Sequence, residues 1–383
     1  MNRKVGIVSM GYHGFSPVSP DLSFRELVYA AASKAYSKAG ITPGDVDMFI
    51  CAAEDFCEGY SISDEYCNDQ LGAVLKPVHT VTGEYLQAIA NAAMIIQSGL
   101  GRIVVVESHS KASNIKNMDA IHSFGMDPVF NRSLRVTPHF AAGLEMSRYL
   151  SETKTSEEHC ARIVVKNRAN ALSNPSAGHG AILSASDVLA SDPVAWPVSR
   201  LSIAPRSDGC IVTVLAEESV ARSLASDPVW ILGTGWATES STLENRAWGE
   251  PVSVDIAAQM AYKEAGITVP SQQIDLFEID DSYSFKELQT LEGLRVVGRG
   301  QAAHALDEGR LGPEGDIPTN VSGGSQGVGH LLEATGGQKL LELFLQLTYQ
   351  AGERQLPDVQ VGLAQAWRGV PTTTSAVIIV GNE

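Results

Sequence analysis

Apolar positions along the chain alternate between short continuous runs and longer stretches with helical spacing. Residues 85–98 carry Ala, Ile and Leu at helical intervals and are followed by Gly99, which is typical of a helix C-terminus. The run Ile103-Val104-Val105-Val106 predicts a strand that is buried on both faces. Similar runs occur at residues 209–215, 229–232, 359–364 and 375–380. This alternation is typical of an α/β protein.

A helix–glycine–strand unit occurs twice. Residues 35–42 read Ala-Tyr-Ser-Lys-Ala-Gly-Ile-Thr, and residues 261–268 read Ala-Tyr-Lys-Glu-Ala-Gly-Ile-Thr. Each copy ends a helix at its glycine and is followed by a strand, at residues 47–51 in the first copy and 275–279 in the second. Because the spacing is near half of the chain length, we expect two similar α/β halves rather than a solenoid.

The segment between the two copies is partly irregular. Predicted helices at residues 140–151 and 157–171 are separated by loops, which indicates an inserted segment that covers a site. We therefore expect three parts. They are a first half made of residues 1–110 and 191–225, a covering segment of residues 111–190, and a second half of residues 226–383.

The chain is acidic, with a net charge of −16, which argues against a nucleic-acid partner because such partners reward a basic face. Residues 111–170 differ from the rest, since they hold nine basic and six acidic residues and are net +3. Their charge is compatible with a local site for an anionic group, or with an ordinary solvated surface.

Five cysteines, an odd number without a CxxC pair, fit neither a disulfide framework nor a zinc ribbon, so we expect no metal site. The apolar run after Met1 is too short for a secretory signal, and no stretch approaches the roughly 20 apolar residues of a membrane span. A cytoplasmic protein without a membrane partner is the expectation.

Two glycine-rich turns near the C-terminus carry a family resemblance. Residues 320–324 read Asn-Val-Ser-Gly-Gly, and residues 329–336 begin Gly-His and end Ala-Thr-Gly. They resemble the NxSGG and GHxxxATG turns of the thiolase superfamily. Residues 86–99, the pairs Lys166-Asn167 and Asn174-Pro175, and Asp208-Gly209 extend the similarity over nearly the whole chain.

The chain is most similar to the sterol-carrier-protein-type branch and to bacterial and archaeal thiolase-like subunits, such as the thiolase subunit of benzoylsuccinyl-CoA thiolase. The resemblance implies the thiolase fold, in which two duplicated α/β halves form five layers, αβαβα, with an inserted loop domain. It also implies coenzyme A as a substrate and no covalently bound cofactor.

The family's nucleophilic cysteine is absent from its expected position. Aligned on the helix that follows it, the family's CASGLQA matches residues 82–88, which places Thr82 at the cysteine position. A threonine hydroxyl does not ionise near neutral pH without an adjacent base, so Thr82 is either a helix cap or, less readily, an acyl acceptor, unless this register is shifted. No cysteine follows Cys210, so the family's second, acid/base cysteine is also missing.

The resemblance leaves other candidates for catalysis. His330 stands in the GHxxxATG turn, where the family histidine activates the thiol or forms part of an oxyanion hole. In Glu278-Ile279-Asp280-Asp281, a family histidine is replaced by Asp280 while Asp281 remains. Glu84, two residues after Thr82, could join them, since carboxylates that share a pocket raise one another's pKa. His330 could instead cap the following helix, and each of the carboxylates could equally be exposed.

Residues for binding coenzyme A or substrate are expected in the same loops and in the basic covering segment. The candidates are Ser322, Gly323, Gly324, Tyr283, Arg132 and Arg135.

Three functions are compatible with these residues. The first is thiolysis or condensation of a β-ketoacyl-CoA in which coenzyme A itself is the nucleophile and no acyl-enzyme forms. The second is a thiolase-fold aldolase that cleaves an acyl-CoA by a retro-aldol step, with Asp280, Asp281 or Tyr283 as the base. The third is a non-catalytic subunit that binds acyl-CoA. For each, the resemblance implies a homodimeric core, and similar subunits often partner a small zinc-ribbon/OB-fold protein.

Overall fold

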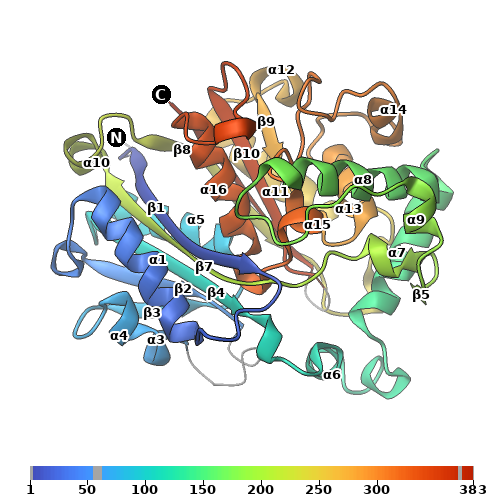
Figure 1. Ribbon diagram of the computed structural model, residues 1–383, viewed down its shortest axis with the longest axis horizontal. Coiled ribbons are helices and arrows are strands. Elements are labelled where there is room, and N and C mark those ends of the chain that lie inside the picture. The colour runs from blue at the N-terminus through green and yellow to red at the C-terminus, as the bar shows by residue number, and fades with distance from the viewer. Residues whose placement is uncertain (1–2, 55–62, 370–372, 383) are drawn as a thin grey trace.

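A single mixed sheet of nine strands organises the protein. The computed structural model describes residues 3–54, 63–369 and 373–382. The strand order is β3-β2-β4-β7-β1-β8-β11-β10-β9 (Figure 1). The strands are β1 (Val5–Ser16), β2 (Met48–Ala52), β3 (Val78–Val81), β4 (Ile103–Lys111), β7 (Asp208–Glu217), β8 (Val229–Thr238), β9 (Leu276–Glu278), β10 (Val361–Trp367) and β11 (Thr374–Gly381).

The two halves repeat one another, as the sequence predicts. In the first half β1 leads into α1 (Phe24–Ala39) and then β2, and in the second β8 leads into α11 (Val252–Ala265) and then β9. Both helices end at a left-handed glycine, Gly40 and Gly266. The halves join where β1 pairs with β8 over a short antiparallel stretch, so their strands form one continuous sheet.

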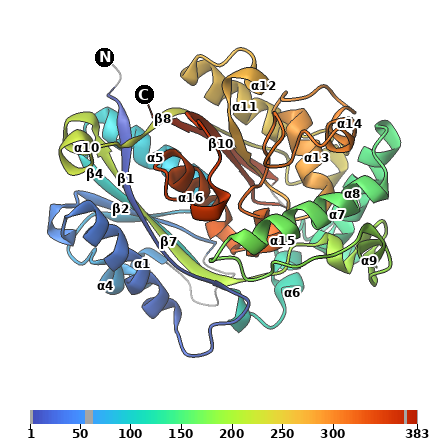
Figure 2. The ribbon, with the colours of Figure 1, turned by 45° about the horizontal axis from the view of Figure 1, so that its top comes forward.

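The layers follow the predicted αβαβα order. The continuous sheet divides at the β1–β8 junction into a first half-sheet, from β3 to β1, and a second, from β8 to β9. Helix α1 covers the outer face of the first half-sheet, and α11 covers the outer face of the second. Between the half-sheets lie α5 (Tyr85–Ser98) and α16 (Thr335–Leu347), whose apolar side chains fill the central core (Figure 2). The predicted helix at residues 85–98 is confirmed.

Alternation along a strand explains why the central strands are apolar throughout. On β4, Val104 and Val106 belong to the central core, whereas Ile103 and Val105 belong to the outer core under α1. Because side chains alternate between the two faces and both faces are covered, every position on the strand is buried.

The covering segment lies against the second half. It holds α6 (Met118–Phe124), α7 (Pro138–Glu152), α8 (Glu157–Asn170) and α9 (Ala185–Leu189). Helix α8 packs on α13 (Ser284–Gly293) and α15 (Gly324–Val328), and α7 packs on the hairpin of β5 (Pro193–Ala195) and β6 (Val198–Ser199). This hairpin therefore lies beside the covering helices, although its residues follow the predicted segment. The three-part division stays a proposal.

Short helices complete the described chain. They are α3 (Ser63–Tyr66), α4 (Asn68–Leu71), α10 (Glu218–Leu224), α12 (Pro270–Gln273) and α14 (Ala302–Asp307). Within the described ranges, no helix combines the length and apolarity needed to cross a bilayer.

Equivalent glycines let each outer helix approach its sheet closely. A Cβ added at Gly11 on β1 would lie 2.1 Å from the Ala31 carbonyl oxygen of α1. A Cβ at Gly235 on β8 would lie 2.1 Å from the Ala257 carbonyl oxygen of α11. Any side chain at these positions would push helix and sheet apart.

We therefore expect Gly11→Ala to destabilise the protein by about 1–3 kcal/mol, the usual cost of overpacking. Gly44→Ala is the control, because its added Cβ would meet nothing nearer than the Thr42 hydroxyl at 3.4 Å. Urea denaturation followed by circular dichroism measures both variants. Equal midpoints for the two variants would contradict the close approach.

Candidate active site

A pocket opens where the first turns of α5 and α16 meet the covering segment. Its lining residues come from the first half, the covering segment and the second half. They are Glu54, Glu84, Asp119, His122, Pro138, His139, Ile203, Ala204, Arg206, Ser282, Tyr283, His330, Leu332, Glu333, Trp367, Arg368 and Gly369. Titratable side chains make up most of this set, which is typical of a catalytic site.

Glu84 joins the N-termini of the two central helices. It is the N-cap of α5, where one carboxylate oxygen accepts a hydrogen bond from the Leu86 amide at 2.6 Å. Its other oxygen accepts from the Gly336 amide of α16 at 2.5 Å. Burial raises the pKa of Glu84 to about 8, although both amide donors and the charge of Lys339 oppose that rise. A carboxyl group with this pKa can give or take a proton near neutral pH.

His330 is held as a neutral imidazole. The Leu332 amide donates to its Nδ1 at 3.2 Å, so in the neutral ring the proton is on Nε2. Burial, followed by the charge of Arg206, lowers the pKa of His330 to about 3. The backbone of His330 is fixed as well, because its amide donates to the Pro205 carbonyl at 2.7 Å. His330 therefore offers a hydrogen-bond donor from Nε2, as an oxyanion hole requires.

Three side chains form a chain of polar contacts along one wall. The Tyr283 hydroxyl and His139 Nδ1 are 2.9 Å apart, and His139 Nε2 lies 3.6 Å from a carboxylate oxygen of Asp119. The two rings pack edge to face. Burial lowers the pKa of His139 and raises that of Tyr283, so both side chains are neutral at rest. Such a chain can move a proton between the Tyr283 oxygen and the imidazole.

A second cavity of about 520 Å³ continues from the pocket and shares Asp119, His139, Ile203, Ala204 and Arg206 with it. Its further lining includes the basic side chains Lys116, Arg168 and Arg200. With Arg206, four cations and one carboxylate from the described part of the chain line this cavity, although the chain has a net charge of −16. This cavity is suited to an anionic group.

Several candidates from the sequence lie elsewhere. Thr82 is exposed and is absent from the pocket lining, so Glu84 takes the inward position at the start of α5. Asp281 is fully buried beneath α15, where it accepts hydrogen bonds from the Ser325 and Gln326 amides at 2.6 and 3.1 Å. Asp280 is also fully buried and binds the Ser282 hydroxyl at 2.7 Å. Neither aspartate lines the pocket.

Of the predicted binding residues, one lines the pocket and the others lie outside it. Tyr283 lines the pocket, whereas Ser322, Gly323 and Gly324 are buried outside it. The Ser322 hydroxyl donates to Glu278 at 2.6 Å, which holds the glycine-rich turn in place. Arg132 donates to backbone carbonyls within the covering segment, and Arg135 is exposed; neither lines the pocket or the basic cavity.

Sequence reasoning missed Asp119, His122, His139, Arg206 and Arg368. The motifs of the resemblance do not single them out, and they are brought together only by the fold. The basic excess of residues 111–170 was the one signal that pointed to this region.

The cysteines do not supply the missing nucleophile in the part of the chain that the structure describes. Cys51, Cys67, Cys160 and Cys210 are buried and free, and none of them lines the pocket. Cys57 lies outside the described residues.

Comparison with known families matches both halves of the chain. The profile of the thiolase N-terminal domain matches residues 7–183, and the profile described as thiolase C-terminal domain-like matches residues 235–382. An acetyl-CoA acetyltransferase of Methanothermobacter thermautotrophicus is 27% identical over 98% of this chain and 99% of its own length. Human sterol carrier protein 2 is 29% identical over 94% of this chain and 69% of its own length.

Solved structures agree on the fold. The Ltp2-ChsH2(DUF35) aldolase superposes with a TM-score of 0.85 at 23% identity, over 99% of this chain and 98% of that one. Human mitochondrial 3-ketoacyl-CoA thiolase superposes with a TM-score of 0.74 at 15% identity, over 100% of this chain and 99% of that one. At these identities the likeness establishes the fold alone.

The neutral histidines of the pocket make stability depend on pH. Burial lowers the pKa of His122 to about 4, whereas an unfolded histidine titrates near 6.5. Above pH 6.5 neither state binds this proton; as the pH falls toward 4 only the unfolded chain binds it, so stability is lost. We expect His122→Gln to reduce the loss between pH 7 and 4 by roughly 2–3 kcal/mol, since each pKa unit is worth about 1.4 kcal/mol.

The control is His304→Gln, because His304 is an exposed side chain on α14. Urea unfolding at a series of pH values gives the slope of the unfolding free energy against pH for the wild type and the two variants. An unchanged slope in His122→Gln would show that this imidazole is not held neutral by the fold.

Proposed function

Because this chain belongs to the thiolase superfamily, we propose that its pocket acts on an acyl-CoA as a retro-aldolase. The reaction would cleave a β-hydroxyacyl-CoA into a carbonyl compound and a shorter acyl-CoA, or run in reverse as a condensation. This reaction needs a base and an oxyanion hole but no thiol nucleophile.

One observation carries this proposal. The Tyr283–His139–Asp119 chain opens into the same pocket as His330 and Glu84. Tyr283 was one of the bases that the sequence offered for an aldolase, whereas the alternatives Asp280 and Asp281 are buried elsewhere. The neutral phenol and imidazole can relay a proton without first forming a costly buried phenolate.

The relay begins the bond cleavage. The Tyr283 oxygen accepts the proton of the substrate β-hydroxyl while its own proton passes to His139 Nδ1. Asp119 stabilises the imidazolium that results. The alkoxide then forms a carbonyl as the Cα–Cβ bond breaks, and the bonding electrons enter the thioester as an enolate.

Glu84 and His330 act on that enolate. The Nε2–H of His330 donates to the enolate oxygen, since Nδ1 is already an acceptor. Glu84, with its pKa of about 8, is protonated at neutral pH and gives its proton to the enolate carbon. The proton held on His139 returns through Tyr283 to the pocket, and Glu84 is reprotonated from solvent, so the cycle closes without a covalent intermediate.

The basic cavity would hold the coenzyme A portion. Lys116, Arg168, Arg200 and Arg206 surround it, and it joins the pocket at Arg206 and His139. Phosphate groups bound there would direct the pantetheine arm inward to the Tyr283–His139–Asp119 chain. Arginine is well suited to this task because its planar donors match phosphate oxygens.

Direct thiolysis is the second candidate. A pKa of about 8 places Glu84 close to the value of an ordinary thiol, so Glu84 could deprotonate coenzyme A for attack on a β-ketoacyl-CoA. The likeness to an acetyl-CoA acetyltransferase over nearly both full lengths supports this alternative. A dependence on free coenzyme A separates the two reactions, because only thiolysis consumes it.

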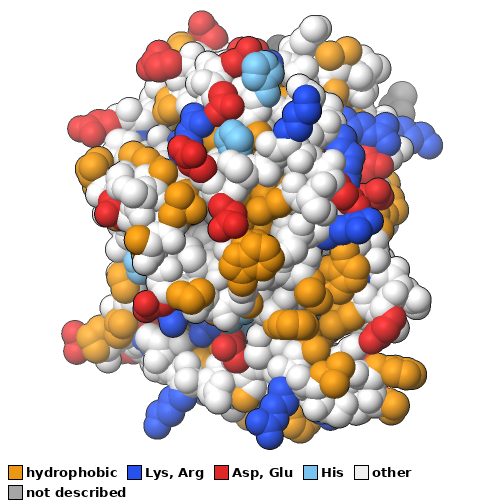
Figure 3. Space-filling model, turned by 90° about the vertical axis from the view of Figure 1, so that its right-hand side faces the viewer, with side chains coloured by type: hydrophobic (Ala, Val, Ile, Leu, Met, Phe, Trp, Pro, Cys, Tyr) orange, Lys and Arg blue, Asp and Glu red, His pale blue; other side chains and the backbone are white. Residues whose placement is uncertain are grey.

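We also propose that the chain works in an assembly, as a homodimeric core with a small partner subunit. Hydrophobic side chains gather on the face that carries the covering segment (Figure 3). Phe124, Phe130, Leu134 and Trp196 in this region are 62–75% exposed. Apolar surface of this kind marks interaction sites. The Ltp2-ChsH2(DUF35) aldolase, a two-component assembly by name, has the same fold.

We expect Tyr283→Phe to lower kcat by roughly 10²–10⁴-fold, since it removes the hydroxyl that begins the relay. The control is Tyr349→Phe, because Tyr349 is 62% exposed and lies away from the pocket lining. Incubation with β-hydroxyacyl-CoA substrates, followed by mass spectrometry of the released acyl-CoA, measures the rate. His330→Ala tests the non-catalytic alternative, which requires activity of any complex to survive this change.

The same assay without free coenzyme A decides between the reactions. Cleavage that proceeds without it supports the retro-aldol step. Cleavage that requires it, or that also occurs unchanged in Tyr283→Phe, would contradict the proposed relay.

A second expectation concerns binding. Arg200→Gln should raise KM for an acyl-CoA several-fold and leave kcat unchanged, because Arg200 lines the basic cavity and not the pocket. The acyl-pantetheine analogue, which lacks the nucleotide phosphates, should show the same KM with both proteins. An equal rise for both substrates would place the phosphates elsewhere.

A further inference from the structure

Five metal-ligating side chains collect on the outer face of the first half-sheet, away from the pocket. They are Cys51 on β2, Glu107 and His109 on β4, Cys210 on β7, and Cys67 at the start of α4. All of them are at most 4% exposed. None of them lines the pocket described above.

The sheet register brings these residues together. Cys51 stands opposite Glu107 in the parallel β2–β4 pair, and His109 stands opposite Cys210 in the antiparallel β4–β7 pair. Glu107 and His109 are two residues apart on one strand and so point to the same face. That face is the outer one, because Val105 of the same strand packs in the outer core under α1.

The surroundings are mostly apolar. The side chains that pack between α1 and the sheet include Leu27, Val28, Phe49 and Val105. A carboxylate in such a layer is costly unless it is paired. One carboxylate oxygen of Glu107 has two partners. His109 Nδ1 lies 2.8 Å from it, and the Cys210 sulfur lies 3.6 Å from it.

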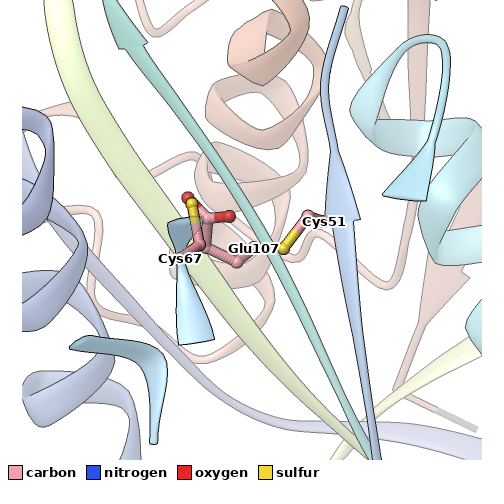
Figure 4. A group of neighbouring side chains, drawn as sticks. All are labelled: Cys51, Cys67 and Glu107. Atoms are coloured by element: carbon pink, nitrogen blue, oxygen red, sulfur yellow. The ribbon is translucent and has the colours of Figure 1, made fainter. Parts of the chain in front are cut away.

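Two thiols lie beside that carboxylate. One ligand atom each from Cys51, Cys67 and Glu107 lies within 4.8 Å of the other two. Figure 4 shows the Cys51 sulfur directed toward the Glu107 side chain, with Cys67 next to the same carboxylate.

We propose that Cys51, Cys67 and Glu107 bind a zinc ion. Two sulfurs and a carboxylate oxygen are donors that Zn²⁺ accepts, at about 2.3 Å for sulfur and 2.0–2.2 Å for oxygen. Tetrahedral sulfur ligands at that length lie about 3.8 Å apart, so ligand atoms within 4.8 Å of one another would have to approach by about 1 Å to close the site.

The other two residues complete the arrangement. Cys210 is a further donor for the fourth position, since its sulfur lies 3.6 Å from a Glu107 oxygen. His109 holds the carboxylate by a hydrogen bond, as partners of metal ligands commonly do. The site is closed and buried, which makes it structural: it would tie β2, β4 and β7 to α4 beneath α1.

This inference departs from the sequence expectation that no metal binds. Cys51 and Cys67 are 16 positions apart, and Cys67 and Glu107 are 40 positions apart. The ligands therefore form no CxxC or other short motif that could be recognised in the sequence.

Cobalt titration of the reduced, chelator-stripped protein tests the proposal on the wild type. We expect the thiolate-to-cobalt absorption of a tetrahedral site, its displacement by zinc, and about one zinc per chain by elemental analysis. Cys67→Ser should lose this absorption and most of the bound zinc. Cys160→Ser should keep both, because Cys160 is a buried cysteine of α8 outside the cluster.

Circular dichroism and the unfolding midpoint accompany each variant, so that loss of folding is not read as loss of a ligand. Zinc should raise the unfolding temperature of the wild type and of Cys160→Ser, but not that of Cys67→Ser. The proposal is overturned if the reduced wild type binds neither cobalt nor zinc, or if Cys67→Ser binds them as well as Cys160→Ser. A Cys51–Cys67 disulfide found in freshly isolated protein would also overturn it.

Discussion

The meeting of two helix N-termini at one carboxylate is the constraint on which the site depends. Helices α5 and α16 both direct the positive ends of their dipoles and their unpaired amides at the same point. Glu84 accepts one amide from each helix, so it belongs to both halves at once. Gly336 makes this possible, because a Cβ there would lie 2.1 Å from the Glu84 oxygen. The junction between the duplicated halves is therefore also the floor of the pocket.

Buried charged residues of the second half stabilise this junction. Lys339 of α16 is fully buried, with its amine 3.5 Å from Asp281, and its charge favours the ionised forms of Glu84, Glu278 and Asp280. Asp281 in turn holds the first amides of α15. These acidic residues fix the glycine-rich turns that carry His330. Their role is to position the site, whereas Glu84, Tyr283 and His330 are among the groups that line the pocket.

Each part of the chain contributes to the pocket and none completes it. The first half supplies Glu84, and the second supplies His330 and Tyr283. The covering segment supplies Asp119 and His139, which give the Tyr283 hydroxyl a partner that can hold a proton. In the proposed retro-aldol reaction, such a chain takes the place of the sulfur nucleophile, so that proton transfer replaces acyl transfer. This shift is consistent with a thiolase fold that cleaves carbon–carbon bonds without an acyl-enzyme.

The family resemblance implied the layer order and the turn that carries His330. The sequence pattern alone determined the duplicated halves and the helix at residues 85–98. These features are local, because periodic burial and a glycine at a helix end are written in neighbouring residues. Tertiary structure alone decided that Glu84 rather than Thr82 turns inward, that His139 meets Tyr283 across 144 positions, and that Cys51 and Cys67 lie against Glu107. Such pairs depend on strand register and on the path of the covering segment, which bring together residues that no spacing along the chain relates.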